Sequence, residues 1–115
     1  SGKKLLPDPY LIPHSLIFHM LIWVLYDIEN DRSRTKAAKA CMQAGLYRVQ
    51  FSCFLGRLSP AGKSSLSLQL EELIDEEKDK VYIFPMSQDE LRNTVLLGQA
   101  FDRKLVNDEV NALFL

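Results

Sequence analysis

Asp27 is the side chain of this sequence best placed to do chemistry, because it follows an apolar run and precedes a basic segment. The run from Leu21 to Tyr26 predicts a buried strand, which would hold the carboxylate rigidly at its end. A carboxylate held in this way suits a hard cation such as Mg²⁺, or a contact at a dimer axis. The alternative is structural, since a carboxylate at a strand end also caps turns and helices.

Basic residues follow Asp27 in an uncompensated window. No Asp or Glu occurs from position 32 to position 70, and the acids then gather between positions 71 and 79. The window contains Arg32, Arg34, Lys36, Lys39, Arg48, Arg57 and Lys63. Although the net charge is only -1, such asymmetry can create a positive surface that suits a phosphate backbone. The alternative is a solvated helix face that nearby acids balance.

The size and cysteine content of the chain indicate one small cytoplasmic domain. A chain of 115 residues that is 47% hydrophobic can build one core, with a margin that oligomerisation would improve. Cys41 and Cys53 have no zinc-ligand spacing and are expected to be buried small hydrophobes. The apolar stretch 16–26 contains His19 and ends before Asp27. It is therefore too short for a membrane span, which needs about 20 apolar residues.

The chain is expected to divide into an extension, a domain and a tail. Residues 1–19 contain three prolines, begin with a Ser-Gly pair that resembles a protease scar, and end where Met20 looks like a native start. We therefore treat 1–19 as vector-derived or upstream sequence, 20–97 as the domain and 98–115 as a tail. The tail contains, among other apolar residues, Leu105, Val106, Val110, Leu113 and Phe114. The tail is expected either to dock a partner or extend a sheet, or to pack on its own domain.

Periodicity and turn signals predict alternating strands and helices. The expected elements are a strand at 21–28, a helix to Ala44, a strand at 47–55, a helix from Pro60 to Ile74, a strand at 81–86 and a short strand at 94–97. Asp31 or Ser33 would cap the first helix, and Gly45 would end it in a left-handed conformation. A hairpin partner within 50–58 would complete the order β-α-β-β-α-β. This is an α+β, ferredoxin-like fold, with an antiparallel sheet and two helices on one face.

The second strand predicts how subunits would associate. Strict alternation over 47–55 puts Tyr47 and four other residues on one face, and leaves Gln50, Ser52 and Phe54 on the uncovered face. A half-polar sheet face with one large aromatic suggests a homodimer interface, in which Phe54 packs between subunits.

At this point several segments together resemble a known family. They are Tyr26-Asp27-Ile28, Arg34 and Lys36 in the first helix, Gly45, Arg48-Val49-Gln50-x-Ser52-x-Phe54, and Gly56-Arg57-Leu58. In this order and spacing they resemble the second of the two core adaptation proteins of CRISPR systems, a family of small CRISPR-associated endonucleases. The segments 70–74 and 81–86 also look like this family's second helix and fourth strand, so the resemblance covers roughly 20–97.

The resemblance implies a homodimer in which the Tyr26-Asp27 motifs of both subunits face each other across the axis. Asp27 would then be a ligand, shared between partners, for Mg²⁺ or Mn²⁺, with Tyr26 either a minor catalytic group or a core aromatic. It further implies cleavage of RNA or DNA, with single-stranded RNA as a possible partner, and a scaffold that holds duplex DNA and the CRISPR integrase. The phosphate-binding candidates are Arg32, Arg34, Lys36, Lys39 and Arg48.

The sequence also indicates how limited the metal site would be. Asp27 gives one carboxylate per subunit, and Asp31 is the nearby acid that could support it. His14 and His19 lie in the extension, so the domain itself supplies no histidine base, and Mg²⁺ would be bound mainly through water.

Three classes of function therefore remain open. The first is the adaptation scaffold, and the second a nuclease acting in its own right, including a ribonuclease of the virulence-associated D toxin type. The third is a ferredoxin-like regulatory module without a nucleic-acid role. We expect the scaffold, with metal-dependent cleavage as a secondary property.

Overall fold

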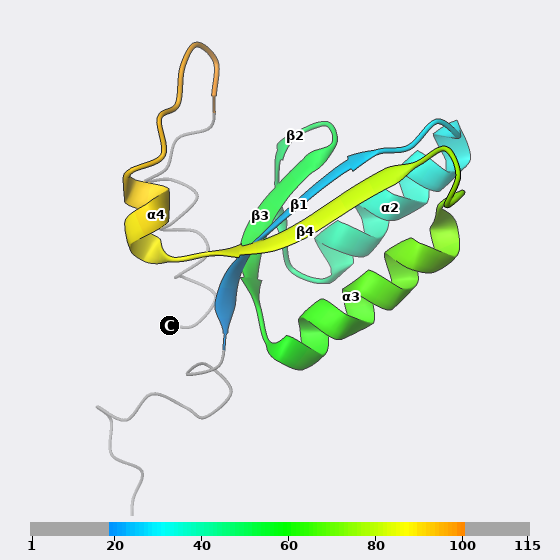
Figure 1. Cartoon of the computed structure of the whole chain (residues 1–115), viewed down its shortest axis with the longest axis horizontal. Helices are drawn as coiled ribbons and strands as arrows, with labels where there is room; N and C mark the ends of the chain where they lie inside the picture. Colours follow the sequence, from blue (N-terminus) through cyan, green and yellow to red (C-terminus); the bar gives the residue numbers. More distant parts are fainter. Residues whose placement is uncertain (1–18, 101–115) are drawn as a thin grey trace, which may run out of the picture.

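The computed structural model describes residues 19–100, and within them the chain folds into an antiparallel sheet covered by two helices (Figure 1). The elements are β1 (Met20–Asp27), α2 (Asp31–Gln43), β2 (Tyr47–Gln50), β3 (Cys53–Leu58), α3 (Pro60–Leu73), β4 (Lys80–Met86) and α4 (Gln88–Arg92). The strand order is β2-β3-β1-β4, which confirms the ferredoxin-like prediction. The predictions for 1–18 and for the apolar tail residues beyond Ala100 lie outside the described residues.

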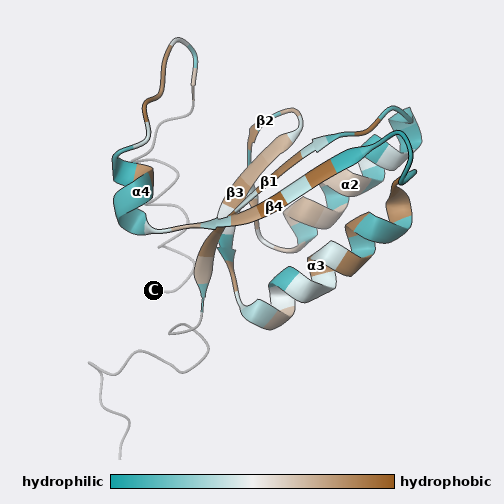
Figure 2. Ribbon diagram, in the orientation of Figure 1, coloured by the Kyte–Doolittle hydropathy of each residue, from teal (hydrophilic) through white to brown (hydrophobic). Residues whose placement is uncertain are grey.

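The main core lies between the sheet and the helices α2 and α3. β1 is central because it pairs antiparallel with both β3 and β4, and its alternate residues Ile22, Val24 and Tyr26 face the helices. α2 contributes small buried residues, among them Ala37 and Cys41, which let the helix approach the sheet closely. Figure 2 shows the resulting contrast, with a mostly apolar β3 and a hydrophilic loop between α3 and β4.

Helix ends follow the predicted chemistry with one correction. The side chain of Asn30, not that of Asp31 or Ser33, caps α2 by accepting a hydrogen bond from the Ser33 nitrogen at 2.9 Å. Asn30 is extended, so Asp31 already begins the helix. Gly45 follows α2 with φ of 95°, as predicted, and Ser59 caps α3 through the Gly62 nitrogen at 3.0 Å.

The segment predicted as one strand over 47–55 is a hairpin. Phe51 and Ser52 form a turn between β2 and β3, and the register pairs Arg48 with Phe54 with an irregularity before Gln50. Tyr47, Val49, Cys53 and Leu55 still share one face, as the alternation predicts. The helices, however, cover the other face, which carries Phe54. Phe54 is 0% exposed and stacks on Tyr26 with ring centroids 6.1 Å apart. The prediction that Phe54 packs between subunits on the uncovered face is therefore wrong.

The sheet face opposite α2 and α3, called the open face below, is apolar instead of half-polar. Its buried cluster is Leu21, Trp23, Cys53, Leu55 and Leu91. Phe84 stacks on Trp23 with centroids 6.3 Å apart and is 39% exposed, and Tyr82 beside it on β4 is 60% exposed. Gln50 and Ser52 lie instead around the hairpin turn, so the predicted interface residues do not form this face.

The chain after β4 also differs from the prediction. α4 begins with a capping box in which Ser87 and Glu90 bond each other's backbone nitrogens, and its Leu91 packs on the open face. Residues 94–97, predicted as a strand, are irregular here, and Val95 and Leu97 are exposed. Within 19–100, no helix is long and apolar enough to cross a membrane.

Candidate metal and nucleic-acid site

Asp27 is the last residue of β1 and points away from the helices. Alternation along the strand puts its neighbour Tyr26 in the helix-side core and Asp27 on the open face, where it is exposed. The sheet register places Lys80, the first residue of β4, directly across from it. The Asp27 carboxylate makes no hydrogen bond or ion pair with any other described residue, so it is free to bind a ligand.

The Asp27 carboxylate is the kind of ligand that a hard cation prefers, but one chain supplies too few such ligands to hold the cation. A carboxylate oxygen is a ligand that Mg²⁺ prefers, and Mg²⁺ commonly keeps several waters beside one or two carboxylates. Among residues 19–100, however, no three His, Cys, Asp or Glu side chains are grouped closely enough to hold a metal. One chain therefore supplies a single ligand, and a second copy would be needed for another.

Asp31 does not support Asp27 as predicted, because it is committed to Arg34. The two side chains form an ion pair at the start of α2. Arg34 also donates through Nη1 to the carbonyl oxygens of Ile28, at 2.9 Å, and Glu29, at 3.3 Å. The Arg34 guanidinium thus holds the loop that follows Asp27. This structural role explains why the Arg34 side chain is partly buried, which a role in phosphate binding alone would not.

Tyr26 is a core aromatic in this structure. Its ring is 6% exposed, and its hydroxyl donates to the Phe51 carbonyl oxygen at 3.4 Å. Burial raises the pKa of the hydroxyl, helped by the nearby Cys41, while Arg48 partly offsets the shift. A hydroxyl that is buried, bonded and on the opposite sheet face from Asp27 has no access to a substrate held by that carboxylate.

Asp79 is a residue that the sequence reading missed. Its Oδ1 accepts from the Glu29 nitrogen at 3.0 Å, and its Oδ2 accepts from the Asp75 nitrogen at 2.8 Å. These backbone hydrogen bonds, that of Asp75 first, hold the pKa of Asp79 below its usual value. The carboxylate joins the loop after Asp27 to the loop before β4. Asp79 directly precedes β4, the strand that pairs with β1, and this position in the sequence could have indicated that it lies near the end of β1.

The predicted basic residues divide into groups that point in different directions. Arg32, Lys36 and Lys39 recur at helical spacing along one exposed side of α2 and are called the basic stripe below. Lys36 and Lys39 line a shallow groove between α2 and α3, which Glu72 also lines. Arg34, two positions before Lys36, projects from a different side of the helix. The basic residues on one face of α2 that could bind phosphates are therefore fewer than the sequence predicted.

Arg48 belongs to the hairpin instead of the basic stripe. Its Nε and Nη2 both donate to the Phe51 carbonyl oxygen, at 3.2 and 2.7 Å. The guanidinium carbon lies 5.5 Å from the ring centroids of Phe51 and of Phe54. Arg48 is still exposed to solvent, so its charge can act on a ligand at the hairpin.

Both cysteines are buried free thiols, as the sequence predicted. Burial raises the pKa of Cys41 to about 12 and that of Cys53 to about 11. Thiols with such pKa values are protonated at neutral pH and are poor nucleophiles and metal ligands.

Comparison with known proteins gives a consistent family. Residues 20–94 match the family model described as CRISPR associated protein Cas2. The chain is 39% identical over 69 residues to the CRISPR-associated endoribonuclease Cas2 1 of Archaeoglobus fulgidus, covering 60% of this chain and 73% of the relative. It is 32% identical over 81 residues to a CRISPR-associated endonuclease Cas1/endonuclease Cas2 fusion of Thermoproteus tenax, covering 70% of this chain and 31% of the fusion.

A solved structure agrees with these sequence matches. The fold superposes on the crystal structure of Streptococcus pyogenes Cas2 at pH 6.5 with a TM-score of 0.61 and 27% identity. The match covers 69% of this chain and 100% of the solved one. The whole solved chain is therefore matched, and only this chain has unmatched residues.

Proposed function

The chain belongs to the CRISPR-associated protein Cas2 family, and from this premise we propose that it is a homodimeric scaffold of CRISPR adaptation. In this role it binds duplex DNA and the CRISPR integrase, and it carries a Mg²⁺-dependent endonuclease activity centred on Asp27. The observation that carries the proposal is the position of Asp27, exposed and unpartnered at the end of β1 on the apolar open face.

The open face supports homodimerisation. Tyr82 and Phe84 expose large aromatic surface on β4, next to the buried Trp23. Covering such a surface with a second copy is favourable, by about 25 cal/mol for each Å² of apolar area removed from water. In an isologous dimer the same patch contributes from both subunits. Because Asp27 is on the same face, a two-fold axis near the end of β1 would bring two Asp27 carboxylates together.

The basic stripe supports duplex binding. α2 packs against one face of the sheet (Figure 1), and Asp27 is on the other face by the alternation of β1. A dimer formed through the open face therefore leaves Arg32, Lys36 and Lys39 on its outer surface. Binding of a phosphate backbone there would release counterions and weaken steeply with salt. The integrase partnership draws on the Thermoproteus tenax relative, in which a Cas1 endonuclease and a Cas2 endonuclease form a single chain.

Cleavage would depend on what Asp27 holds. When bound, Mg²⁺ would polarise a water and neutralise charge on the phosphate. Asp27 of each subunit would hold this cation, and Lys80 across the strand pair could offset phosphate charge beside it. The described residues include no histidine near Asp27 that could act as a base, so water or the phosphate itself would accept the proton.

A stand-alone metal-dependent ribonuclease, including the virulence-associated D toxin type, is the second candidate. It is favoured by the Archaeoglobus fulgidus relative, whose name describes an endoribonuclease. Reconstituted spacer integration with the cognate integrase separates the two. The scaffold proposal predicts that integration depends on this protein. Equal integration without it, together with Mg²⁺-dependent RNA cleavage, would favour the ribonuclease.

A further inference from the structure

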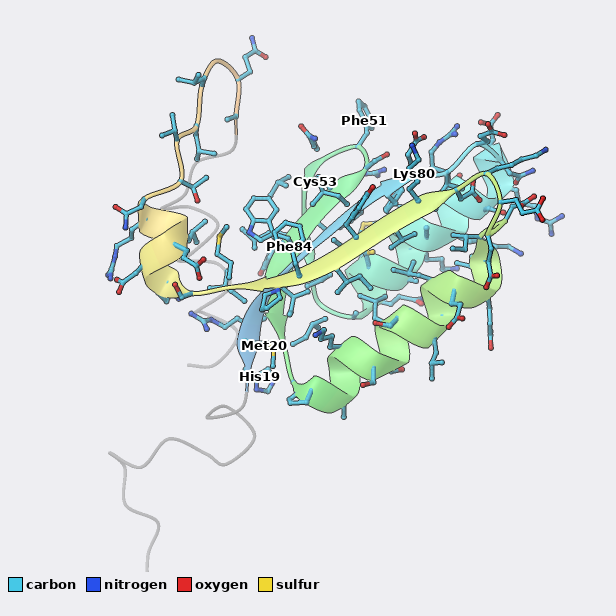
Figure 3. The ribbon with its side chains drawn as sticks, viewed as in Figure 1. His19, Met20, Phe51, Cys53, Lys80 and Phe84 are labelled. Carbon is cyan, nitrogen blue, oxygen red and sulfur yellow. The ribbon has the colours of Figure 1, made fainter. Side chains whose placement is uncertain are left out.

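The turn between β2 and β3 presents an exposed aromatic ring. Phe51 is 85% exposed, more than any other large hydrophobic residue described between 19 and 100. Figure 3 shows its side chain at the tip of the hairpin, projecting away from the sheet. Turns favour Gly, Asn, Asp, Ser and Pro, so turn geometry alone does not account for a phenylalanine at this position.

The backbone that carries this ring is firmly held. The carbonyl oxygen of Phe51 accepts hydrogen bonds from Nε and Nη2 of Arg48, at 3.2 and 2.7 Å, and from the Tyr26 hydroxyl at 3.4 Å. These donors come from β2 and from β1. Since a ligand loses less entropy in binding to a group that is already fixed, Phe51 is presented as a preorganised contact.

The surroundings of Phe51 favour a planar, negatively charged ligand over an apolar protein surface. The Arg48 guanidinium lies 5.5 Å from the ring centroid. The residues that flank Phe51 are Gln50, which is exposed, and Ser52, which is half-buried. An isolated ring with a guanidinium beside it and polar neighbours matches the way proteins bind single strands, by stacking bases on aromatics and neutralising phosphates with Arg.

The hairpin tip is also tied to the end of β1 that carries Asp27. The Tyr26 nitrogen donates to the Ser52 carbonyl oxygen at 3.1 Å, one residue before Asp27 in the chain. A nucleotide stacked on Phe51 would therefore lie at the same end of the sheet as the proposed metal ligand.

We propose that Phe51, with Arg48 beside it, is a stacking site for an unpaired nucleobase. The nucleic acid that reaches the Asp27 end of the sheet would accordingly be single-stranded there, whereas the duplex is held by the basic stripe. This inference rests on the proposed nucleic-acid function and specifies the substrate class at one part of the surface.

The test measures affinities by fluorescence anisotropy at one fixed salt concentration. The probes are a short oligothymidylate, a short oligouridylate and a blunt-ended duplex without unpaired nucleotides. Phe51→Leu keeps an apolar side chain but removes the ring, and Phe51→Trp enlarges the stacking surface. Leu68→Ala is the matched control, because Leu68 is also an exposed apolar residue but lies on α3.

We expect Phe51→Leu to weaken binding of both single strands at least about fivefold, with unchanged affinity for the blunt-ended duplex. Phe51→Trp should bind single strands as well as the unaltered protein or better, and its added tryptophan should be quenched by them. Leu68→Ala should bind all three probes normally. If single-strand affinity is kept in Phe51→Trp but lost in Phe51→Leu, the ring acts by stacking and not merely as an apolar contact.

Two results would overturn the inference while leaving the proposed function intact. One is normal single-strand binding by Phe51→Leu, and the other is a change in oligomeric state, which would make Phe51 a subunit contact. If the unaltered protein bound none of the probes, the stacking site and the proposed nucleic-acid function would both be wrong.

Discussion

The carboxylate of Asp79 accepts a hydrogen bond from the backbone nitrogen of Glu29 at 3.0 Å, across 50 positions of sequence. Its second oxygen holds the Asp75 nitrogen at 2.8 Å. One side chain therefore fastens the segment that follows Asp27 to the segment that starts β4. Because β4 pairs with β1 up to the register of Asp27 with Lys80, this link fixes the end of the sheet where the proposed metal ligand lies.

Asp79→Ala is expected to lower the melting temperature, because two backbone N–H groups lose their acceptor. The pKa of Asp79 is depressed in the folded protein, so its contribution to stability is complete above the ordinary carboxyl pKa of 3.8 and is lost as the pH falls through the lower folded value. Thermal unfolding of both proteins across this range checks the sign. Glu76→Ala, in the same loop, should behave as wild type; an equal effect would mean that loop charge matters instead of the hydrogen bonds.

Arg34→Ala and Lys36→Ala should have different consequences although the residues are two apart. Arg34 donates to the Ile28 and Glu29 carbonyl oxygens, so its removal should cost about 1 kcal/mol of unfolding free energy. Lys36 is exposed on the basic stripe, and its removal should leave unfolding unchanged. Chemical denaturation measures both values. Similar stabilities of the two variants would contradict the assigned role of Arg34.

The double substitution Lys36→Ala with Lys39→Ala should weaken duplex DNA binding. If each lysine contacts one phosphate, the slope of log affinity against log salt should fall in magnitude by about 2. A salt titration of binding measures this slope. Lys78→Ala, in the acidic loop before β4, is the control for loss of a positive charge elsewhere, and an equal change there would remove the stripe as the duplex surface.

Phe51 and Phe54 form a matched pair for testing the corrected hairpin. Phe54 is 0% exposed in the core, so Phe54→Ala should lower the free energy of unfolding by about 3 to 5 kcal/mol. Phe51→Ala should change it by less than about 0.5 kcal/mol, because the ring is in solvent. Denaturant unfolding at low protein concentration compares them. A stable Phe54→Ala protein that only failed to dimerise would restore the interface role predicted from alternation.

The features that the sequence predicted well are those with a local physical signal. The apolar run of β1 ending at Asp27, the left-handed Gly45 and the Ser59-Pro60 helix start each need only neighbouring residues to be recognised. Fold class followed from their order. The cap of α2 is Asn30, which precedes the predicted caps Asp31 and Ser33 by one and three residues; all three residues are good caps, so the sequence did not separate them.

The errors come from places where tertiary contacts decide. The hairpin turn at Phe51 and Ser52 contains no Gly, Asn or Asp, and it is held by Arg48 and Tyr26 instead of by turn chemistry. The alternation separated Phe54 correctly from Cys53 and Leu55, but alternation alone does not tell which face of the sheet the helices cover, and the wrong face was taken as uncovered. Arg34 was grouped with Lys36 by charge, although only contacts with the loop after β1 reveal its structural role. The spacing of Ser87 and Glu90 is a capping-box signal for the start of α4, but the sequence prediction did not include this helix.

The most direct test of the central claim is spacer integration with the purified cognate integrase, comparing the unaltered protein with Asp27→Ala. Both must first be shown to be folded dimers that bind duplex DNA, and Mg²⁺-dependent RNA and DNA cleavage is measured in parallel. If the protein is a scaffold with a separate metal-dependent activity, Asp27→Ala should support integration fully and lose cleavage. Failure of the unaltered protein to stimulate integration at all would contradict the account.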